Sequence, residues 1–156
     1  MSYTILTDSC CDFTKNRYEE LGLVALPLTV NFRGETYPDR NDESLKDMYA
    51  GLRAGEAATT AAVNPQQWKD GLRPLLEQGQ DVLMLVFSSG LSTTYQSAVI
   101  AASEIGEEYP DRKILVVDSL CASLGEGLLA YSAAKKRDAG LSLEELRDWL
   151  ESNKLH

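Results

Sequence analysis

Residues 82–90 read VLMLVFSSG, a run of apolar and aromatic side chains that ends in two serines and a glycine. Two other short apolar runs end in a similar way, because residues 3–7 lead into Asp8–Ser9 and residues 114–117 lead into Asp118–Ser119. Nearly continuous apolar runs of this length are typical of strands buried on both faces of a parallel sheet. Such sheets bind ligands at the carboxyl ends of their strands, so the pattern predicts a site rimmed by serines.

Helix signals alternate with these runs and predict a three-layer α/β/α fold with a mainly parallel sheet plus a β-hairpin. The hairpin is expected from residues 24–32, a strand interrupted by Pro27, followed by Arg33–Gly34 and residues 35–37. Thr59–Thr60 has no apolar periodicity around it and is expected in a loop. Capping signals and apolar periodicity place the starts of six helices near Thr14, Ser44, Asn64, Ser92, Ala122 and Ser142.

Length and composition indicate one soluble domain spanning residues 1–156, with 44% hydrophobic and 25% charged residues. No apolar stretch reaches the roughly 18–20 residues that span a bilayer, and the first residues lack the pattern of a secretory signal. We therefore expect a cytoplasmic protein without stable membrane insertion. The net charge of −9 repels phosphate backbones, so no nucleic-acid partner is expected. The three cysteines, two of them adjacent, are expected to be free thiols.

The hydroxyl-rich segment from Ser88 to Ser97 is the most informative motif. Hydroxyls and loop amides recognise small anionic or carbonyl groups, and Ser92 or Thr93 is expected at a helix N-terminus, which favours a carboxylate or a phosphate. A second interpretation fits the spacing equally well, namely that these residues only cap the helix.

Several catalytic and cofactor chemistries are disfavoured by the sequence. A serine becomes a nucleophile only beside a base, yet the one histidine is His156 and no Gly-x-Ser-x-Gly motif is present. We therefore predict no catalytic residue. Residues 125–130 match a dinucleotide fingerprint in form only, because they start too far beyond the preceding strand, and close helix packing explains the glycines better. Asp8 and Asp118 are expected to accept hydrogen bonds from loop amides and so hold the serine that follows each.

No metal and no cofactor is expected. The acidic and thiol groups of residues 8–12 lack a histidine or a Cys-x-x-Cys pair that would complete a recognised ligand set.

A set of short motifs resembles the DegV family in order and spacing over nearly the whole chain. The most specific motif is Ser88–Gly90–Leu91–Ser92 followed by residues 94–98. The others are residues 7–9, Val24–Pro27–Leu28, Thr59–Thr60, residues 117–119 and Ser123–Gly125–Gly127–Leu128.

This resemblance implies a non-catalytic fatty-acid-binding protein similar to the carrier subunits of bacterial fatty acid kinase. The implied partners are a long-chain fatty acid and the catalytic kinase subunit, which phosphorylates the bound carboxylate. Thr60 and the serines of residues 88–92 would bind the carboxylate while the acyl tail occupies an apolar tunnel. The candidate ligand-binding residues are Thr60, Ser88, Ser89, Gly90, Ser92, Ser9 and Ser119.

Two differences from the family pattern affect this expectation. The family usually has Thr-Ser-Gln-Pro where this chain has residues 60–63, TAAV, so only Thr60 is retained. The chain also resembles the first of two domains, because the second would begin near residues 154–156, and we expect the chain by itself to bind lipid poorly. Two alternative functions remain open: an enzyme that uses the serines to clamp a small anionic substrate, and a non-catalytic interaction or regulatory domain.

Overall fold

The computed structural model describes residues 3–39 and 42–155. Its larger lobe is built on a four-stranded parallel sheet with the strand order β2-β1-β6-β7. The three predicted apolar runs are confirmed as the adjacent strands β1, β6 and β7. The four strands are β1 (Tyr3–Asp8), β2 (Leu23–Leu26), β6 (Asp81–Val86) and β7 (Ile114–Asp118).

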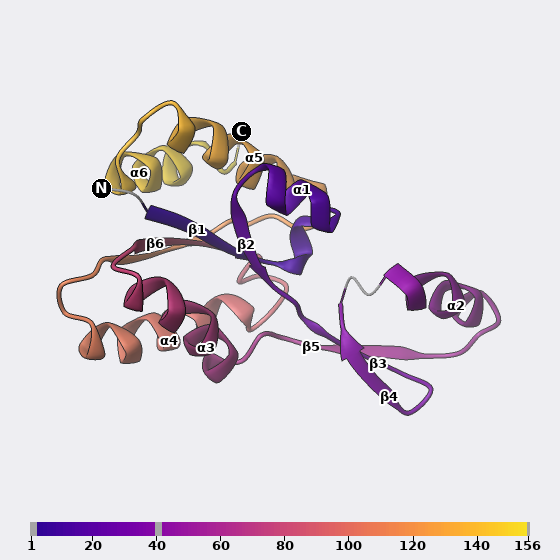
Figure 1. Ribbon diagram of the computed structural model, residues 1–156. Helices are drawn as coiled ribbons and strands as arrows, with labels where there is room; N and C mark the ends of the chain where they lie inside the picture. Colours follow the sequence, from indigo (N-terminus) through magenta and orange to yellow (C-terminus); the bar gives the residue numbers. More distant parts are fainter. Residues whose placement is uncertain (1–2, 40–41, 156) are drawn as a thin grey trace.

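Helices cover both faces of this sheet, which gives the three layers predicted (Figure 1). α1 (Lys15–Glu20), α5 (Leu124–Asp138) and α6 (Leu143–Asn153) lie on one face, while α3 (Pro65–Glu77) and α4 (Thr94–Glu108) lie on the other. Side chains of β6 alternate between the two cores: Leu83 and Leu85 face the first group of helices, and Met84 faces the second. All three are fully buried, as expected for a strand covered on both sides.

A small lobe projects from the carboxyl ends of the parallel strands (Figure 1). It contains a second, antiparallel sheet in the order β4-β3-β5 and one helix, α2 (Asp42–Arg53). Its strands are β3 (Thr29–Phe32), β4 (Glu35–Pro38) and β5 (Ala58–Ala61). The lobe has its own core around Val30, Phe32 and Met48.

Two sequence expectations are corrected here. Residues 24–32 were expected to form one interrupted strand, but Pro27 separates two strands that belong to different sheets. Proline has no N–H to donate and so cannot continue a ladder, which allows the chain to leave the parallel sheet at this point. Thr59–Thr60 was expected in a loop but lies in β5. This strand is held by its pairing with β3, although its own sequence has no apolar periodicity.

The predicted hairpin turn at Arg33–Gly34 is confirmed. Both residues have positive φ, 52° and 79°, which matches the turn type that best suits a two-residue hairpin. The Arg33 guanidinium pairs with Asp47 of α2 at 2.7 Å and with Glu56 at 2.6 Å. The tip of the hairpin is thereby connected to the helix of the same lobe.

The helix starts agree with the capping signals at three positions. Thr14 caps α1, Asn64 forms a capping box with Gln67, and Ser142 forms one with Glu145. Ser44 was expected to cap α2 but lies inside that helix, and its side chain is outside the described part of the structure. The predicted free thiols are confirmed for Cys10, Cys11 and Cys121. Within the described ranges, no helix combines the length and the apolar character needed to cross a bilayer.

Candidate functional site

Two aspartates hold together the loops at the carboxyl edge of the parallel sheet. Asp8 is fully buried at the end of β1, and its two carboxylate oxygens accept hydrogen bonds from the amides of Cys10 and Phe87, both at 2.9 Å. Asp118, at the end of β7, accepts hydrogen bonds from the amides of Ser89 and Leu120, both at 3.1 Å. The predicted role of both aspartates is thereby confirmed. Burial raises the pKa of Asp8, while the two amide hydrogen bonds oppose that shift.

The loop between β6 and α4, residues 88–92, carries four of the candidate residues. The amide of Ser88 donates to the carbonyl of Cys121, and the amides of Gly90, Leu91 and Ser92 all donate to the carbonyl or hydroxyl oxygen of Ser88. Every amide of this loop, including that of Ser89, therefore already donates to a protein group. A ligand at this loop can therefore form hydrogen bonds with the side-chain hydroxyls. The sequence also predicts a contribution from the loop amides, but these amides already donate within the protein.

The hydroxyls of this loop differ in how far they are engaged. Ser88 accepts a hydrogen bond from Gly90 and is nearly buried, while Ser89 is exposed and its hydroxyl has no hydrogen-bond partner among the described residues. Ser92 accepts from the amide of Thr94 at 3.1 Å, and the two hydroxyls are 2.8 Å apart. Ser92 thus engages the first amide of α4, although the N-cap position itself is Thr93, whose side chain makes no capping hydrogen bond.

Ser9 and Ser119 lie at the same edge, but each of their hydroxyls both donates and accepts a hydrogen bond within the protein. The Ser119 hydroxyl donates to the carbonyl of Cys121 and accepts from the amide of the same residue, both at 3.2 Å. The Ser9 hydroxyl donates to Asp39 and accepts from the amide of Leu28. Their side chains support the edge of the sheet.

Thr60 lies on the small lobe, in a different sheet from the serines. It is exposed and pairs with Val30, so its side chain shares the face of the sheet that also carries Val30 and Phe32. No hydrogen bond joins Thr60 to the serines within the described residues. The candidate residues therefore lie on two different lobes, the serine loop on the large lobe and Thr60 on the small lobe; below they are called the two walls of the proposed site.

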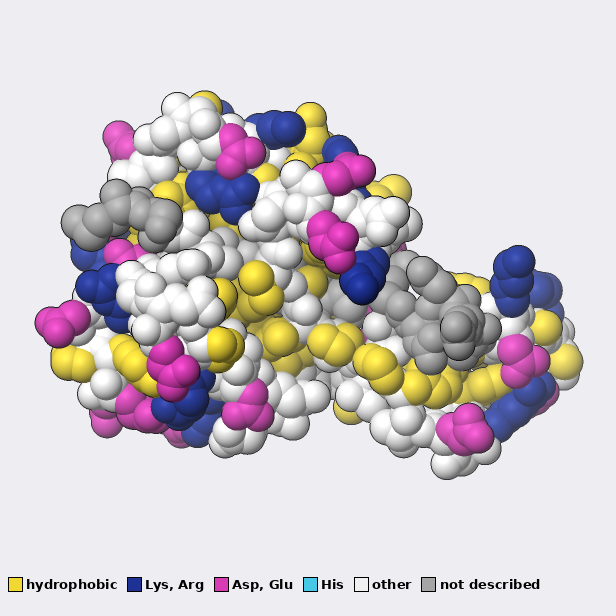
Figure 2. Space-filling view, in the orientation of Figure 1, with side chains coloured by type: hydrophobic (Ala, Val, Ile, Leu, Met, Phe, Trp, Pro, Cys, Tyr) yellow, Lys and Arg dark blue, Asp and Glu magenta, His cyan; other side chains and the backbone are white. Residues whose placement is uncertain are grey.

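A cavity of about 220 Å³ opens where the two lobes meet. Ser9, Ala25 and Pro27 contribute to it from the carboxyl ends of β1 and β2, and Asp39 contributes from the small lobe. Phe13, Lys15 and Tyr18 complete the lining. Figure 2 shows hydrophobic side chains in a band that runs from the middle of the large lobe across to the small lobe.

Glu126, in α5, is a buried acid that was not among the residues predicted from the sequence. It has no exposed surface, and its Oε1 accepts a hydrogen bond from the Thr7 hydroxyl at 3.3 Å. Its Oε2 is buried without a hydrogen-bond partner among the described residues. Burial, reinforced by the charge of Asp8, raises the pKa of Glu126 to about 9. The carboxyl group is therefore protonated at neutral pH. A glutamate between two glycines, Gly125 and Gly127, was the available signal.

The sequence has no histidine within residues 3–155, and burial raises the pKa of the Cys10 and Cys11 thiols above their ordinary value. The described residues contain no group of three acidic, cysteine or histidine side chains arranged to hold a metal ion. The fold and the polar edge thus define an α/β domain with a serine-rich edge at the carboxyl ends of its parallel strands.

Comparison with known proteins identifies the family. The family model described as an uncharacterised protein of the DegV family matches residues 2–156. The DegV domain-containing protein CPE0026 of Clostridium perfringens is 39% identical over 154 residues, which are 97% of this chain and 53% of that protein. The chain belongs to the DegV family, and it spans about half the length of the curated relatives it matches.

Solved structures agree with this assignment. A DegV family protein from Thermus thermophilus, whose structure is described as showing fatty acid binding, superposes with a TM-score of 0.87. The two chains are 35% identical, and the match covers 99% of this chain and 54% of that one. A stearic acid-binding protein from Eubacterium ventriosum gives 0.86 at 30% identity, covering 96% and 52%. The fatty acid kinase B3 protein of Streptococcus pneumoniae, loaded with linoleic acid, gives 0.79 at 27% identity, covering 99% and 54%.

Proposed function

We propose that this chain is the amino-terminal half of a fatty acid carrier, in which hydroxyls of the two walls bind the carboxylate of a long-chain fatty acid. The observation that carries the proposal is the loop of residues 88–92, where the amides are used internally and the Ser89 hydroxyl is exposed at the carboxyl edge of a parallel sheet. Hydroxyl donors of this kind bind carboxylates. Support comes from relatives at 30–35% identity that are described as binding fatty acids.

The acyl tail would lie along the apolar surface between the lobes. Burial of a long acyl chain at about 0.8 kcal/mol per methylene contributes on the order of 10 kcal/mol before ordering costs. The cavity of about 220 Å³ is smaller than the roughly 300–1,000 Å³ typical of small-molecule sites. This cavity is therefore too small to enclose the whole tail, and we expect the chain alone to bind lipid weakly.

In the complete carrier, we expect the bound carboxylate to be presented to a separate kinase subunit. The chain itself would contribute binding and no chemistry, because the side chains of Ser88, Ser89 and Ser92 have no basic side chain as a hydrogen-bond partner among the described residues. The similarity to the Streptococcus pneumoniae fatty acid kinase B3 protein supports this role, at 27% identity over half of that protein.

Copurification from bacterial cells tests the proposal. The chain is joined to the half of CPE0026 that extends beyond the matched region, and lipids extracted from the purified protein are identified by mass spectrometry. We expect a long-chain fatty acid in the parent protein and at least a tenfold loss in a Thr60→Ala/Ser89→Ala variant, a difference of about 1.4 kcal/mol or more. Ser142→Ala, which removes a remote helix cap, serves as the control and should retain the lipid. A folded parent protein without copurified fatty acid would overturn the proposal.

The hydrogen bond from the Thr94 amide to the Ser92 hydroxyl also fits a second hypothesis. In that hypothesis the loop has a purely structural role at the start of α4 and the chain is an interaction domain. Ser92→Ala distinguishes the two hypotheses. A loss of about 1 kcal/mol in stability with unchanged lipid content indicates capping alone. A loss of lipid indicates that Ser92 also contacts the ligand. Turnover of a small anionic substrate by this chain without a partner would instead favour an enzyme.

A further inference from the structure

The small lobe has few attachments to the large lobe. Its core, formed around Val30, Phe32 and Met48, contains no residue of the large lobe. Two connecting segments, residues 27–28 and 62–64, join the lobes covalently, and each places one apolar side chain, Leu28 or Val63, in the core beside α3 and α4. A contact between the lobes close to these segments would therefore restrain the angle between them.

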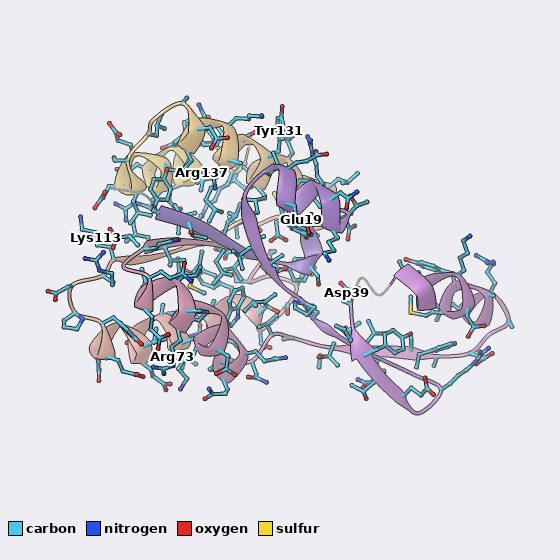
Figure 3. All side chains as sticks on the ribbon, in the orientation of Figure 1. Glu19, Asp39, Arg73, Lys113, Tyr131 and Arg137 are labelled. Atoms are coloured by element: carbon cyan, nitrogen blue, oxygen red, sulfur yellow. The ribbon has the colours of Figure 1, made fainter. Side chains whose placement is uncertain are left out.

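Ser9 makes such a restraint. Its hydroxyl donates to Asp39 Oδ2 at 2.7 Å and accepts from the amide of Leu28 at 3.1 Å. The amide of Asp39 in turn donates to the carbonyl of Leu28 at 2.7 Å. These three contacts, here named the Ser9 bridge, connect the end of β1 to the residue before β3 and to the residue after β4. Figure 3 places Asp39 at the junction of the two lobes.

The surroundings make the Ser9 bridge energetically important. Ser9 is only 3% exposed, and a hydrogen bond from a hydroxyl to a carboxylate is stronger than one between neutral groups. A cavity lies beside these contacts and is lined from both lobes by residues that include Phe13, Pro27 and Asp39. The polar contacts of Ser9 therefore join the lobes next to a space that is not filled by side chains.

We infer that Ser9 is a positioning residue that fixes the angle of the small lobe, and with it the position of the Thr60 wall relative to the serine loop. Thr60 pairs with Val30, two residues beyond Leu28, so it lies about 7 Å along the strand from the bridge. A rotation of the lobe about the bridge therefore moves Thr60 directly. The link to ligand binding rests on the proposed function, whereas the restraint on the lobes does not.

Residual dipolar couplings of backbone N–H groups in the 156-residue chain test the restraint. In the parent protein, couplings from both lobes should fit one alignment tensor. In Ser9→Ala, couplings from the small lobe should shrink relative to those of the large lobe, because the lobe samples more orientations. Asp39→Ala should give the same result, and the double variant should add nothing further. Asp39→Asn retains an acceptor oxygen for the Ser9 hydroxyl, so its couplings should be close to those of the parent protein. Because the Asp39 variants leave the buried Ser9 in place, the test does not depend on the folding of Ser9→Ala alone.

Ser142→Ala is the matched control, since it also removes one capping hydroxyl but lies on α6, far along the chain from the junction. It should lower stability without changing the relative alignment of the lobes. Ser9→Ala and Asp39→Ala couplings that still fit the parent tensor would overturn the inference. The copurification experiment is separate: absence of lipid contradicts the proposed function alone, and unchanged couplings contradict the Ser9 bridge alone.

Discussion

Gly127 is the point of closest approach between α5 and the turn η1 (Ser9–Cys11). A Cβ atom built on Gly127 would lie 2.6 Å from the carbonyl oxygen of Cys11, a backbone atom that cannot move aside cheaply. We expect Gly127→Ala to destabilise the protein by about 2 kcal/mol, because overpacking forces a backbone shift. Urea unfolding measures this change.

Gly106, in α4, is the control for that substitution. A Cβ atom there meets nothing within 4 Å, so Gly106→Ala should stabilise the protein by up to about 1 kcal/mol through helix propensity. Equal effects of the two substitutions would show that steric contact with η1 is not the reason for glycine at position 127.

Glu126 should make stability depend on pH. Because the pKa of Glu126 is raised to about 9 in the folded protein, the folded state retains a proton that the unfolded state releases above its ordinary pKa of 4.5. Stability from this group is therefore greatest at low pH and falls as pH rises towards 9. Glu126→Gln imitates the protonated acid, so its advantage over the parent should grow by about 1 kcal/mol per pH unit between pH 6 and 9.

Chemical denaturation at several pH values measures this advantage. Glu107→Gln, on the exposed surface of α4, is the control and should leave the pH dependence unchanged. A constant difference between Glu126→Gln and the parent over this pH range would contradict a buried, protonated Glu126. The groups that shift the pKa of Glu126, among them Asp8, Thr7, Cys11 and Asp118, are present in both proteins.

At the scale of elements, α6 depends on its N-terminal capping box. The Ser142 hydroxyl accepts from the amide of Glu145 at 3.3 Å, and the Glu145 carboxylate accepts from the amide of Ser142 at 2.8 Å. Ser142→Ala should lower stability by about 1 kcal/mol, because it leaves an amide at the helix start without its partner. Thermal and urea unfolding check this value, and a variant as stable as the parent would mean that packing of Leu146 and Leu150 alone sets the position of α6.

At the scale of the whole molecule, the two lobes should differ in local stability. The large lobe buries two continuous cores, whereas the core of the small lobe has three buried residues, Val30, Phe32 and Met48. Backbone amides of β3 and β5 should therefore exchange hydrogen faster than those of β1 and β6, because local opening of the small lobe exposes less apolar surface. Hydrogen exchange followed by NMR gives the comparison. Equal protection of the two sheets would indicate that they unfold as one unit.

The parallel sheet, the layers of helices around it and three of the six helix starts could be predicted from the sequence. These features depend on local signals: uninterrupted apolar runs such as residues 82–87, and short-range caps such as Asn64–Gln67 and Ser142–Glu145. The serine rim followed as well, because all strands of a parallel sheet end at the same edge.

The separation of the chain into two lobes could not be predicted, because it depends on contacts between residues far apart in the sequence. β5 exists because residues 58–61 pair with a strand 29 residues earlier, a non-local contact without a periodic signal in its own sequence. The same holds for the roles of Ser9 and Glu126. A hydroxyl can bind a ligand or the protein equally well, and it was the placement of Leu28 and Asp39 beside Ser9 that engaged its hydroxyl within the fold. A glutamate is ordinarily charged and exposed, and only its burial beneath Thr7 and Asp8 keeps Glu126 protonated.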